Sequence, residues 1–238
     1  MAGIKLKNIQ KSYQVEDRTV SVLKGIDLEI PQGQITVVLG QSGCGKTTLL
    51  RLSGGLEQAD CGEIVWEGEH KTAFVFQEPR LMPWLNVLDN VVFGLKRGVQ
   101  DRKKIQELIG TVGLSGFEKA YPSQLSGGMK QRVSIARALA YEPDFIMMDE
   151  PFAALDYFTR EQMQKELLRV QKVRGSSILF VTHSIDEALI LGDRIVVIEK
   201  GQIKKVCPVE IPAEQRNLLD DHLISMKKDI IDTLNFIN

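Results

Sequence analysis

The chain has 238 residues, with 43% hydrophobic and 26% charged side chains and a net charge of −1, the composition of an ordinary globular protein. Basic and acidic residues are interspersed, which argues against a partner that is nucleic acid or an anionic membrane surface. Three cysteines without a CxxC pair argue against a disulfide framework and a zinc site and favour a reducing cytoplasm. No apolar run reaches the roughly 18–20 residues of a membrane-spanning helix and no signal peptide opens the chain, so any membrane role is expected to need a partner.

The first third of the chain is expected to form a β lobe and then a buried strand. Apolar and polar residues alternate around Ile4, Val20 and residues 26–30, the pattern of half-buried strands. Residues 35–39 form a continuous apolar run, which is typical of a strand buried on both faces of a parallel sheet. A helix is expected from about Lys46 to a pair of glycines that serve as its C-cap.

The rest of the chain first turns helical and then returns to strands. Apolar residues recur at helical spacing from about Trp84 to Glu142, which predicts a helical insertion. Ser184-x-x-Glu187 is a capping box and predicts a helix start. The other expected elements are strands at 64–66, 73–76, 145–148 and 178–181, a helix at 158–173, a hairpin at 195–206 and a partly helical tail.

Residues 40–47 match the pattern G-x-x-x-x-G-K-[ST] between the buried strand and the following helix. Such a loop points backbone N–H groups and the positive end of a helix dipole at phosphate. Lys46 is expected to balance charge on the β- and γ-phosphates, and Thr47 to offer its hydroxyl to Mg²⁺. The alternative is a chance glycine-rich turn. The residues expected to contact nucleotide here are Gly40, Gln41, Ser42, Gly43, Cys44, Gly45, Lys46, Thr47 and Thr48.

Cys44 lies inside this loop near the start of the helix, where the pKa of a thiol tends to be lowered. If the thiol is exposed, its alkylation is expected to inhibit hydrolysis, and ATP is expected to protect it. The alternative is a small loop residue without a role.

An apolar stretch at 145–148 ends in Asp149 and Glu150. In phosphate-loop enzymes the first such carboxylate holds Mg²⁺, and a neighbouring group orients or deprotonates the attacking water. Asp149 fits the first role and Glu150 the second. The alternative is a pair of solvated acids at a strand end.

A second glycine-rich turn, residues 125–132, opens another helix. One nucleotide has one terminal phosphate, so two such cradles favour a site shared between two copies of the molecule. Locally, Ser126 is nearly as well explained as the cap of a helix over 129–139, with the glycines as the preceding turn.

With these motifs the chain resembles, over almost its full length, the ATPase subunits of ABC transporters. The resemblance implies that Ser126, Gly127 and Gly128 reach across a head-to-tail homodimer to the γ-phosphate held by the partner's phosphate loop. It also assigns roles to four more residues: Gln77 near Mg²⁺ and sensing a transmembrane subunit, Asp156 at the dimer interface, His183 on the γ-phosphate and Tyr13 stacked on adenine. Taken singly, each has a structural alternative, respectively a polar strand end, a helix N-cap, a structural histidine and an ordinary core or surface ring.

Residues 77–91 and 156–161 resemble, more closely, nitrate-, sulfonate- and taurine-type importers. Leu81, Met82 and Trp84 either pack in the core of the helical lobe or line a groove that receives a short helix of a permease. The loop at 68–71 looks shorter than usual, and the tail after Val206 lacks the large regulatory domain of some import ATPases.

The expected fold is α/β, a P-loop NTPase (RecA-like) in which a mostly parallel sheet carries an N-terminal antiparallel β lobe and an inserted helical lobe. All of it is expected to form one ABC ATPase domain. Its expected parts are a β lobe (1–34 and 60–72), a nucleotide-binding core (35–59, 73–84 and 143–206), a helical lobe (85–142) and a C-terminal tail (207–238).

The expected function is hydrolysis of ATP with Mg²⁺. Glu150 is assigned to polarise the water, Lys46 and His183 to stabilise the γ-phosphate, and Thr47, Asp149 and Gln77 to the metal. By the resemblance, a homodimer at the cytoplasmic face of the membrane drives permease subunits that a substrate-binding protein supplies. Nitrate, sulfonate or taurine as cargo rests on analogy alone. Two rival classes remain, a soluble ABC ATPase not coupled to transport and a catalytically inactive nucleotide-binding regulator.

Overall fold

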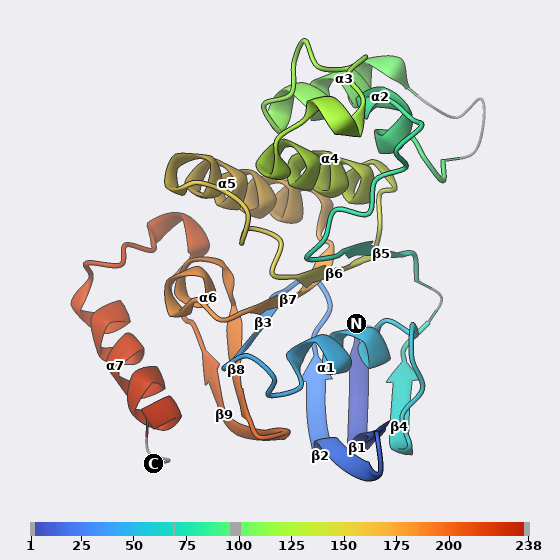
Figure 1. The fold of residues 1–238 in the computed structure, drawn as a ribbon. Helices are drawn as coiled ribbons and strands as arrows, with labels where there is room; N and C mark the ends of the chain where they lie inside the picture. The colour runs from blue at the N-terminus through green and yellow to red at the C-terminus, as the bar shows by residue number, and fades with distance from the viewer. Residues whose placement is uncertain (1–2, 69, 96–100, 236–238) are drawn as a thin grey trace. The chain divides into compact units, whose positions relative to one another are not determined.

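The structure is a computed structural model that describes residues 3–68, 70–95 and 101–235 (Figure 1). Contacts within the chain define two compact units, one of residues 1–69 with 175–238 and one of residues 70–174. Each unit combines helices with β-strands, and the expected α/β class is confirmed. Among the described residues, none of the helices is long and apolar enough to cross a bilayer.

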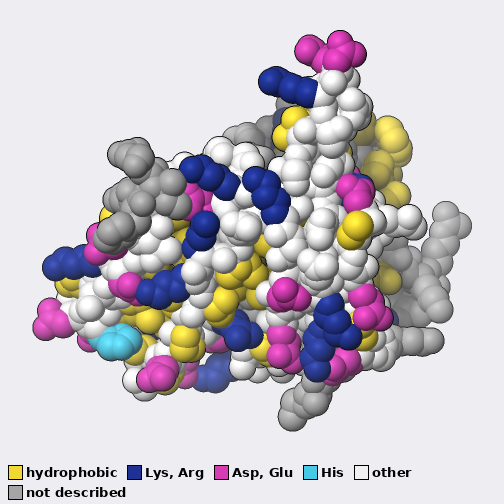
Figure 2. Space-filling model, turned by 90° about the horizontal axis from the view of Figure 1, so that it is seen from below, with side chains coloured by type: hydrophobic (Ala, Val, Ile, Leu, Met, Phe, Trp, Pro, Cys, Tyr) yellow, Lys and Arg dark blue, Asp and Glu magenta, His cyan; other side chains and the backbone are white. Residues whose placement is uncertain are grey.

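The first unit contains a three-stranded antiparallel sheet in the order β2-β1-β4. Its strands are β1 (Ile4–Val15), β2 (Arg18–Ile30) and β4 (Cys61–Trp66). The alternating apolar residues Ile4, Leu6, Leu28 and Ile30 are all buried, because successive side chains of a strand point to opposite faces. Figure 2 shows Lys and Arg side chains interspersed with Asp, Glu and apolar ones over one face of the molecule, in keeping with the balanced charge.

The first unit also carries the strands that support the phosphate loop, in the order β7-β3-β8-β9. Strand β3 (Ile35–Leu39) pairs in parallel with β7 (Ser177–Thr182) and with β8 (Arg194–Glu199), and β9 (Gln202–Pro208) pairs with β8 in antiparallel fashion. Every residue of β3 and β7 is buried, as the continuous apolar runs predict.

Among its described residues, this unit also contains four helical segments. Helix α1 (Lys46–Ser53) follows β3, and α6 (Ile185–Leu191) follows β7. A 3-10 turn η2 (Ala213–Gln215) leads to α7 (Asp221–Asn235). Leu223 and Ile230 of α7 are fully buried, so the tail after Val206 packs onto the unit through one apolar face of this helix.

The second unit combines two parallel strands with most of the helices of the chain. Strand β5 (Thr72–Val75) pairs with β6 (Phe145–Asp149). The helical segments are α2 (Val87–Val91), α3 (Arg102–Thr111), η1 (Pro122–Gln124), α4 (Gly127–Ala140) and α5 (Tyr157–Arg174). Helix α4 contacts α2, α3 and β5, and Val133, Ala136 and Leu139 lie in its buried face.

Candidate functional site

The phosphate loop runs between β3 and α1, and two of its positions require glycine, one because of close contacts and one because of its backbone angle. A Cβ on Gly40 would lie 2.3 Å from the carbonyl oxygen of Ile198 and 2.7 Å from Sγ of Cys44. Gly45, the N-cap of α1, has φ of 107°, which L-residues with side chains rarely adopt. Because Gly45 has no side chain to cap the helix, the first turn of α1 is open to an anion from outside the chain.

Lys46 is the first residue of α1 and is 5% exposed. Its Nζ donates hydrogen bonds to the carbonyl oxygens of Gly40 (2.9 Å) and Gln41 (3.0 Å). The ammonium group therefore lies back over the loop that precedes it. A lysine held at the rim of such a loop supplies one positive charge to whatever anion occupies the cradle.

The structure corrects the expectation for Cys44. Its side chain is 7% exposed, and burial raises the pKa of the thiol although the nearby Lys46 acts in the opposite direction. Desolvation disfavours the thiolate, and here it outweighs the helix N-terminus on which the expected lowering of the pKa depended. The Cys44 carbonyl also accepts a hydrogen bond of 3.2 Å from the Gly201 N–H, so this residue ties the loop to the β8–β9 turn.

Alkylation is therefore expected to reach Cys61 long before Cys44. Cys61 is exposed, and at neutral pH a buried, protonated thiol reacts at least about tenfold more slowly than an exposed one. Labelling with iodoacetamide at pH 7, followed by mass spectrometry of the cysteine peptides, measures both rates in one sample. Raising the pH should speed up the Cys44 reaction, because the pKa of its thiol is raised. Equal rates at pH 7 would contradict the buried placement.

His183 leaves the sheet of the first unit at the same edge as the phosphate loop. Leu39 of β3 and Thr182 of β7 are partners in parallel strands, so Gly40 and His183 begin neighbouring loops. The Ser184 side chain accepts a hydrogen bond of 3.3 Å from the Glu187 N–H, which is one half of the predicted capping box. The Ser184 N–H donates to Oγ1 of Thr182 at 3.0 Å, and this hydroxyl donates to Glu187 at 2.6 Å. The exposed His183 thus lies between two hydrogen-bonded neighbours, Thr182 and Ser184.

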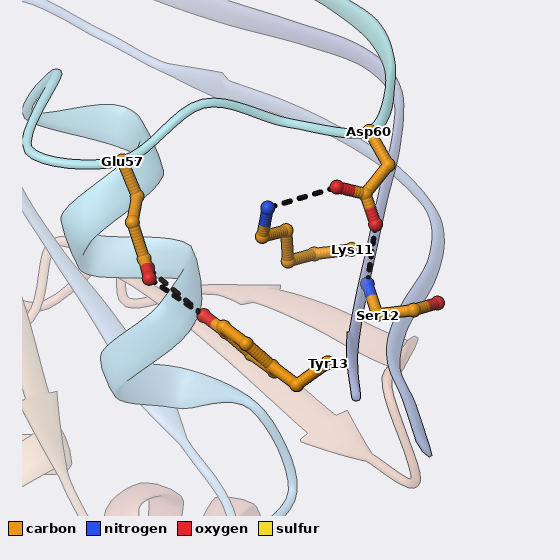
Figure 3. A network of polar contacts seen from close by, with 5 residues as sticks. All are labelled: Lys11, Ser12, Tyr13, Glu57 and Asp60. Carbon is orange, nitrogen blue, oxygen red and sulfur yellow. Dashed lines mark hydrogen bonds and ion pairs between the residues drawn. The ribbon is translucent and has the colours of Figure 1, made fainter. Parts of the chain in front are cut away.

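Tyr13 lies half-buried on β1 with its hydroxyl anchored. The hydroxyl donates to the carboxylate of Glu57, 2.9 and 3.0 Å from its two oxygens (Figure 3). Nζ of Lys11 lies 5.5 Å from the centroid of the ring, and Asp60 accepts hydrogen bonds from Lys11 and from the Ser12 N–H. These contacts fix the ring near the turn after α1 and leave the role on adenine as a proposal.

In the second unit, Gln77 and the two acidic residues leave the parallel strands β5 and β6 at one edge. Val75 pairs with Met148; Gln77 follows soon after the end of β5, Asp149 is the last residue of β6 and Glu150 follows it. Asp149 is 6% exposed. Glu150 has φ of 43°, a left-handed conformation that strains a residue with a side chain and is frequent at functional sites.

In the second glycine-rich turn Ser126 caps α4, as its local interpretation predicts, and the contact with phosphate stays a prediction. Its hydroxyl accepts a hydrogen bond of 3.2 Å from the Met129 N–H, and the helix begins two residues earlier than predicted. A Cβ on Gly128 would lie 3.3 Å from a methyl group of Leu155, so the turn packs against the segment that leads to Asp156. Asp156 caps α5, accepting from the Thr159 N–H at 3.0 Å. Hydrogen bonds with Thr159 lower the pKa of the Asp156 carboxyl group.

Trp84 is 70% exposed, which excludes the core-packing alternative for this side chain. It lies in a turn in which the Leu85 N–H donates to the Met82 carbonyl at 3.1 Å. Asn90, fully buried in α2, accepts from the Met82 N–H at 2.8 Å and donates to three carbonyls of residues 82–86 at 2.9–3.1 Å. Asn90 was not predicted, because an asparagine in a short helical stretch carries no sign of the turn that it fixes.

Together, the two units carry all the predicted site residues, each group within its own unit. The first unit holds Tyr13, residues 40–48 and His183, and the second holds Gln77, Ser126, Gly127, Gly128, Asp149, Glu150 and Asp156. Among the described residues there is no cluster of three or more His, Cys, Asp and Glu that would hold a metal by itself.

A known protein family contains these motifs together. A family model described as ABC transporter matches residues 23–153, more than half of the chain. The chain belongs to the ABC transporter family. The resemblance stated from the motifs is thereby confirmed, and with it ATP binding and the ATPase class.

Curated relatives of this ABC transporter ATPase match over most of its length. The aliphatic sulfonates import ATP-binding protein of Zymomonas mobilis is 41% identical and covers 99% of this chain and 96% of its own. The protein of the same name in Bacillus cereus is 42% identical over 88% of this chain and 87% of its own. An uncharacterized ABC transporter ATP-binding protein of Methanocaldococcus jannaschii is 41% identical over 97% and 91%.

The fold has a counterpart among solved structures. A dimeric post-hydrolysis state of the ATP-binding cassette MJ0796, bound to ADP and Pi, superimposes with a TM-score of 0.80. It is 32% identical in sequence and covers 88% of this chain and all of its own.

Proposed function

We propose that this ATPase is the energy-supplying subunit of an importer, in which two copies close around two ATP and drive permease subunits at the cytoplasmic face of the membrane. The observation that carries the importer assignment is the exposed Trp84, which lies in a turn whose backbone the buried Asn90 binds, within a segment that resembles importers. The cargo is an aliphatic sulfonate or a similar small solute such as nitrate or taurine, delivered by a substrate-binding protein. The names of the relatives from Zymomonas mobilis and Bacillus cereus support the sulfonate.

The roles of the site residues follow from their chemistry. The N–H groups of the phosphate loop bind the phosphates, and Lys46 and His183 bring positive charge or hydrogen bonds to the γ-phosphate. Thr47, Asp149 and Gln77 would hold Mg²⁺, which would neutralise charge on the phosphates. Glu150 accepts the proton of the attacking water. The ring of Tyr13, oriented by Glu57, stacks on adenine.

The second phosphate-binding turn belongs, in this proposal, to the site of the other copy. Ser126 and Gly127 are exposed at the start of α4, and nothing would lie within 4 Å of a Cβ on Gly127. This open helix start suits the γ-phosphate bound by a partner molecule. Asp156 follows the segment that packs on Gly128 and lies at the same interface. The dimeric cassette MJ0796 supports this arrangement.

Replacing Trp84 by Ala is expected to uncouple hydrolysis from uptake. The side chain is largely exposed, so its loss should leave the fold intact and, by removing an anchor of the permease contact, lower uptake of labelled sulfonate about tenfold or more. ATP hydrolysis by the purified protein should change less than about twofold, because the variant leaves the nucleotide-binding residues in place. The measurement compares uptake into membranes that carry the permease with phosphate release by the same variant.

A matched control is Phe117→Ala, which removes another exposed aromatic ring of the second unit. Uptake by this variant should equal that of the parent. Normal uptake with Trp84→Ala would overturn the assignment of Trp84 to the permease contact. Absence of ATP-dependent uptake with the parent protein would overturn the importer assignment and favour an ABC ATPase that works without a membrane partner.

A further inference from the structure

The segment after β5, which carries Gln77, is hydrogen-bonded to helix α4 by two polar side chains, the buried Gln131 and the half-buried Arg137. Gln131 is 1% exposed, and its Nε2 donates to the Phe76 carbonyl at 3.1 Å. Arg137 donates to the carbonyls of Pro79 (3.0 Å) and Arg80 (2.9 Å). Both side chains belong to α4, whose first turn is the second phosphate-binding turn. Side chains of this one helix thus donate hydrogen bonds to three carbonyl groups of residues 76–80.

The two carbonyls bound by Arg137 flank a strained residue. Arg80 has φ of 46°, which is unfavourable for any residue with a side chain except in special turns. The carbonyls of Pro79 and Arg80 lie on either side of the Arg80 Cα, so holding both of them fixes its φ and ψ. The Arg80 guanidinium also lies 3.9 Å from the centroid of the Phe76 ring. Arg137 therefore opposes the tendency of this turn to relax.

Both contacts are retained at an energetic cost. Burial lowers the pKa of Arg137, which shows that its charge is poorly solvated there. The other polar atom of Gln131, its Oε1, is buried and has no hydrogen-bond partner among the described residues, a loss of hydrogen bonding that destabilises the fold. An apolar side chain would avoid both costs. These two polar side chains offset their costs by fixing the backbone of residues 76–80.

We propose that Arg137 and Gln131 are positioning residues that hold the loop of Gln77 on helix α4. This rests on the proposed function, in which Gln77 serves the metal and the permease while the start of α4 serves the partner's nucleotide. A movement of the loop then moves α4, and a movement of α4 moves the loop. The two side chains link the permease contact with the phosphate contact inside one unit.

The chain offers a matched control for Arg137 on the same helix. Arg132 also donates to two successive carbonyls, those of Val112 and Gly113, at 2.9 Å each. These also flank a residue of positive φ, since Gly113 has φ of 66°. Burial lowers the pKa of Arg132 as well. Arg132 thus resembles Arg137 in chemistry, but it holds the end of α3 and not the loop of Gln77.

The test is hydrogen exchange of the full chain, followed by mass spectrometry, in the variants Arg137→Gln and Arg132→Gln. Arg137→Gln is expected to raise exchange of residues 76–86 at least about fivefold, because lost contacts lower the free energy of local opening. Arg132→Gln should raise exchange around 112–118 and leave residues 76–86 as in the parent. Unchanged exchange of 76–86 in Arg137→Gln, or the same increase in both variants, would overturn the proposal.

A kinetic measurement separates positioning from general destabilisation. Arg137→Gln is expected to lower kcat about tenfold with KM for ATP changed less than about threefold, because the phosphate loop lies in the other unit and is untouched. Arg137→Lys keeps the charge without the planar fork and is expected to fall between parent and Gln variant. If Arg137→Gln does not fold, Arg137→Lys with Gln131→Met answers the same question by exchange. Exchange and kcat need no permease, so normal uptake with Trp84→Ala, or no uptake with the parent protein, would count against the proposed function and leave this test standing.

Discussion

Replacing Glu150 by Gln is expected to lower kcat for ATP hydrolysis by a factor of about 100 or more, the usual contribution of a general base. The amide has nearly the shape of the carboxylate but cannot accept the proton of the attacking water. ATP binding should stay within about threefold of the parent value, since no contact to the nucleotide is assigned to this side chain. Phosphate release measures the first quantity and titration with a fluorescent ATP analogue the second.

The same variant also tests the shared site. When hydrolysis is blocked, ATP should hold two copies together, so the protein is expected to elute as a dimer with ATP and as a monomer without it. Hydrolysis at the parent rate would contradict the assignment of Glu150. Loss of hydrolysis without ATP binding would point to a folding defect.

Glu142→Gln is the matched control for this experiment. Glu142 has φ of 51°, close to that of Glu150, and its exposed carboxylate pairs with Arg174 at 3.2 Å. The same change of charge at a similarly strained backbone is expected to leave kcat unchanged, since a single exposed ion pair contributes less than about 1 kcal/mol to stability. A similar loss in both variants would mean that backbone strain or charge, and not the base, explains the effect.

Replacing Gly40 by Ala is expected to weaken ATP binding at least about thirtyfold, equivalent to about 2 kcal/mol. The new Cβ would lie 2.3 Å from the Ile198 carbonyl oxygen, a backbone atom, and 2.7 Å from the Cys44 Sγ. Since the backbone of β8 yields only with difficulty, the phosphate loop itself has to move. Titration with a fluorescent ATP analogue measures the loss.

The three cysteines report where this variant changes the structure. The displaced loop should expose Cys44, so its alkylation is expected to speed up by about tenfold or more, the difference between a buried and an exposed thiol. Cys207, buried elsewhere in the same unit, and the exposed Cys61 should react as in the parent. Faster labelling of Cys207 as well would indicate general unfolding and contradict the local explanation.

Gly55→Ala is the control for the added methyl group. Gly55 has φ of 71°, and a Cβ there would meet nothing within 4 Å. The substitution is expected to cost about 1 kcal/mol of stability from backbone strain and to leave both ATP affinity and the labelling of Cys44 unchanged.

The features that were predicted correctly depend on neighbours in the sequence. The strand at 35–39, the glycines and Lys46 lie within a dozen residues, and each restricts its own backbone or its immediate neighbours. Only one half of the predicted capping box at Ser184 forms. The Ser184 N–H donates instead to the hydroxyl of Thr182, the last residue of β7. For Cys44 the nearby helix start favoured a lowered pKa, with a small loop residue without a role as the alternative. Burial raises the pKa of this thiol instead, and no local pattern records that burial.

The sequence by itself determined the family, the α/β class and the identity of the residues that carry the phosphate chemistry, because these are written in short motifs whose order along the chain is itself informative. Tertiary structure alone decided which polar side chains support those motifs. The hydrogen bonds of Asn90 with Met82, of Tyr13 with Glu57 and of Arg137 with Arg80 join residues that lie 8, 44 and 57 positions apart. The physical reason is that a hydrogen bond of this kind needs a donor and an acceptor within about 3 Å, and only the folded chain brings them together.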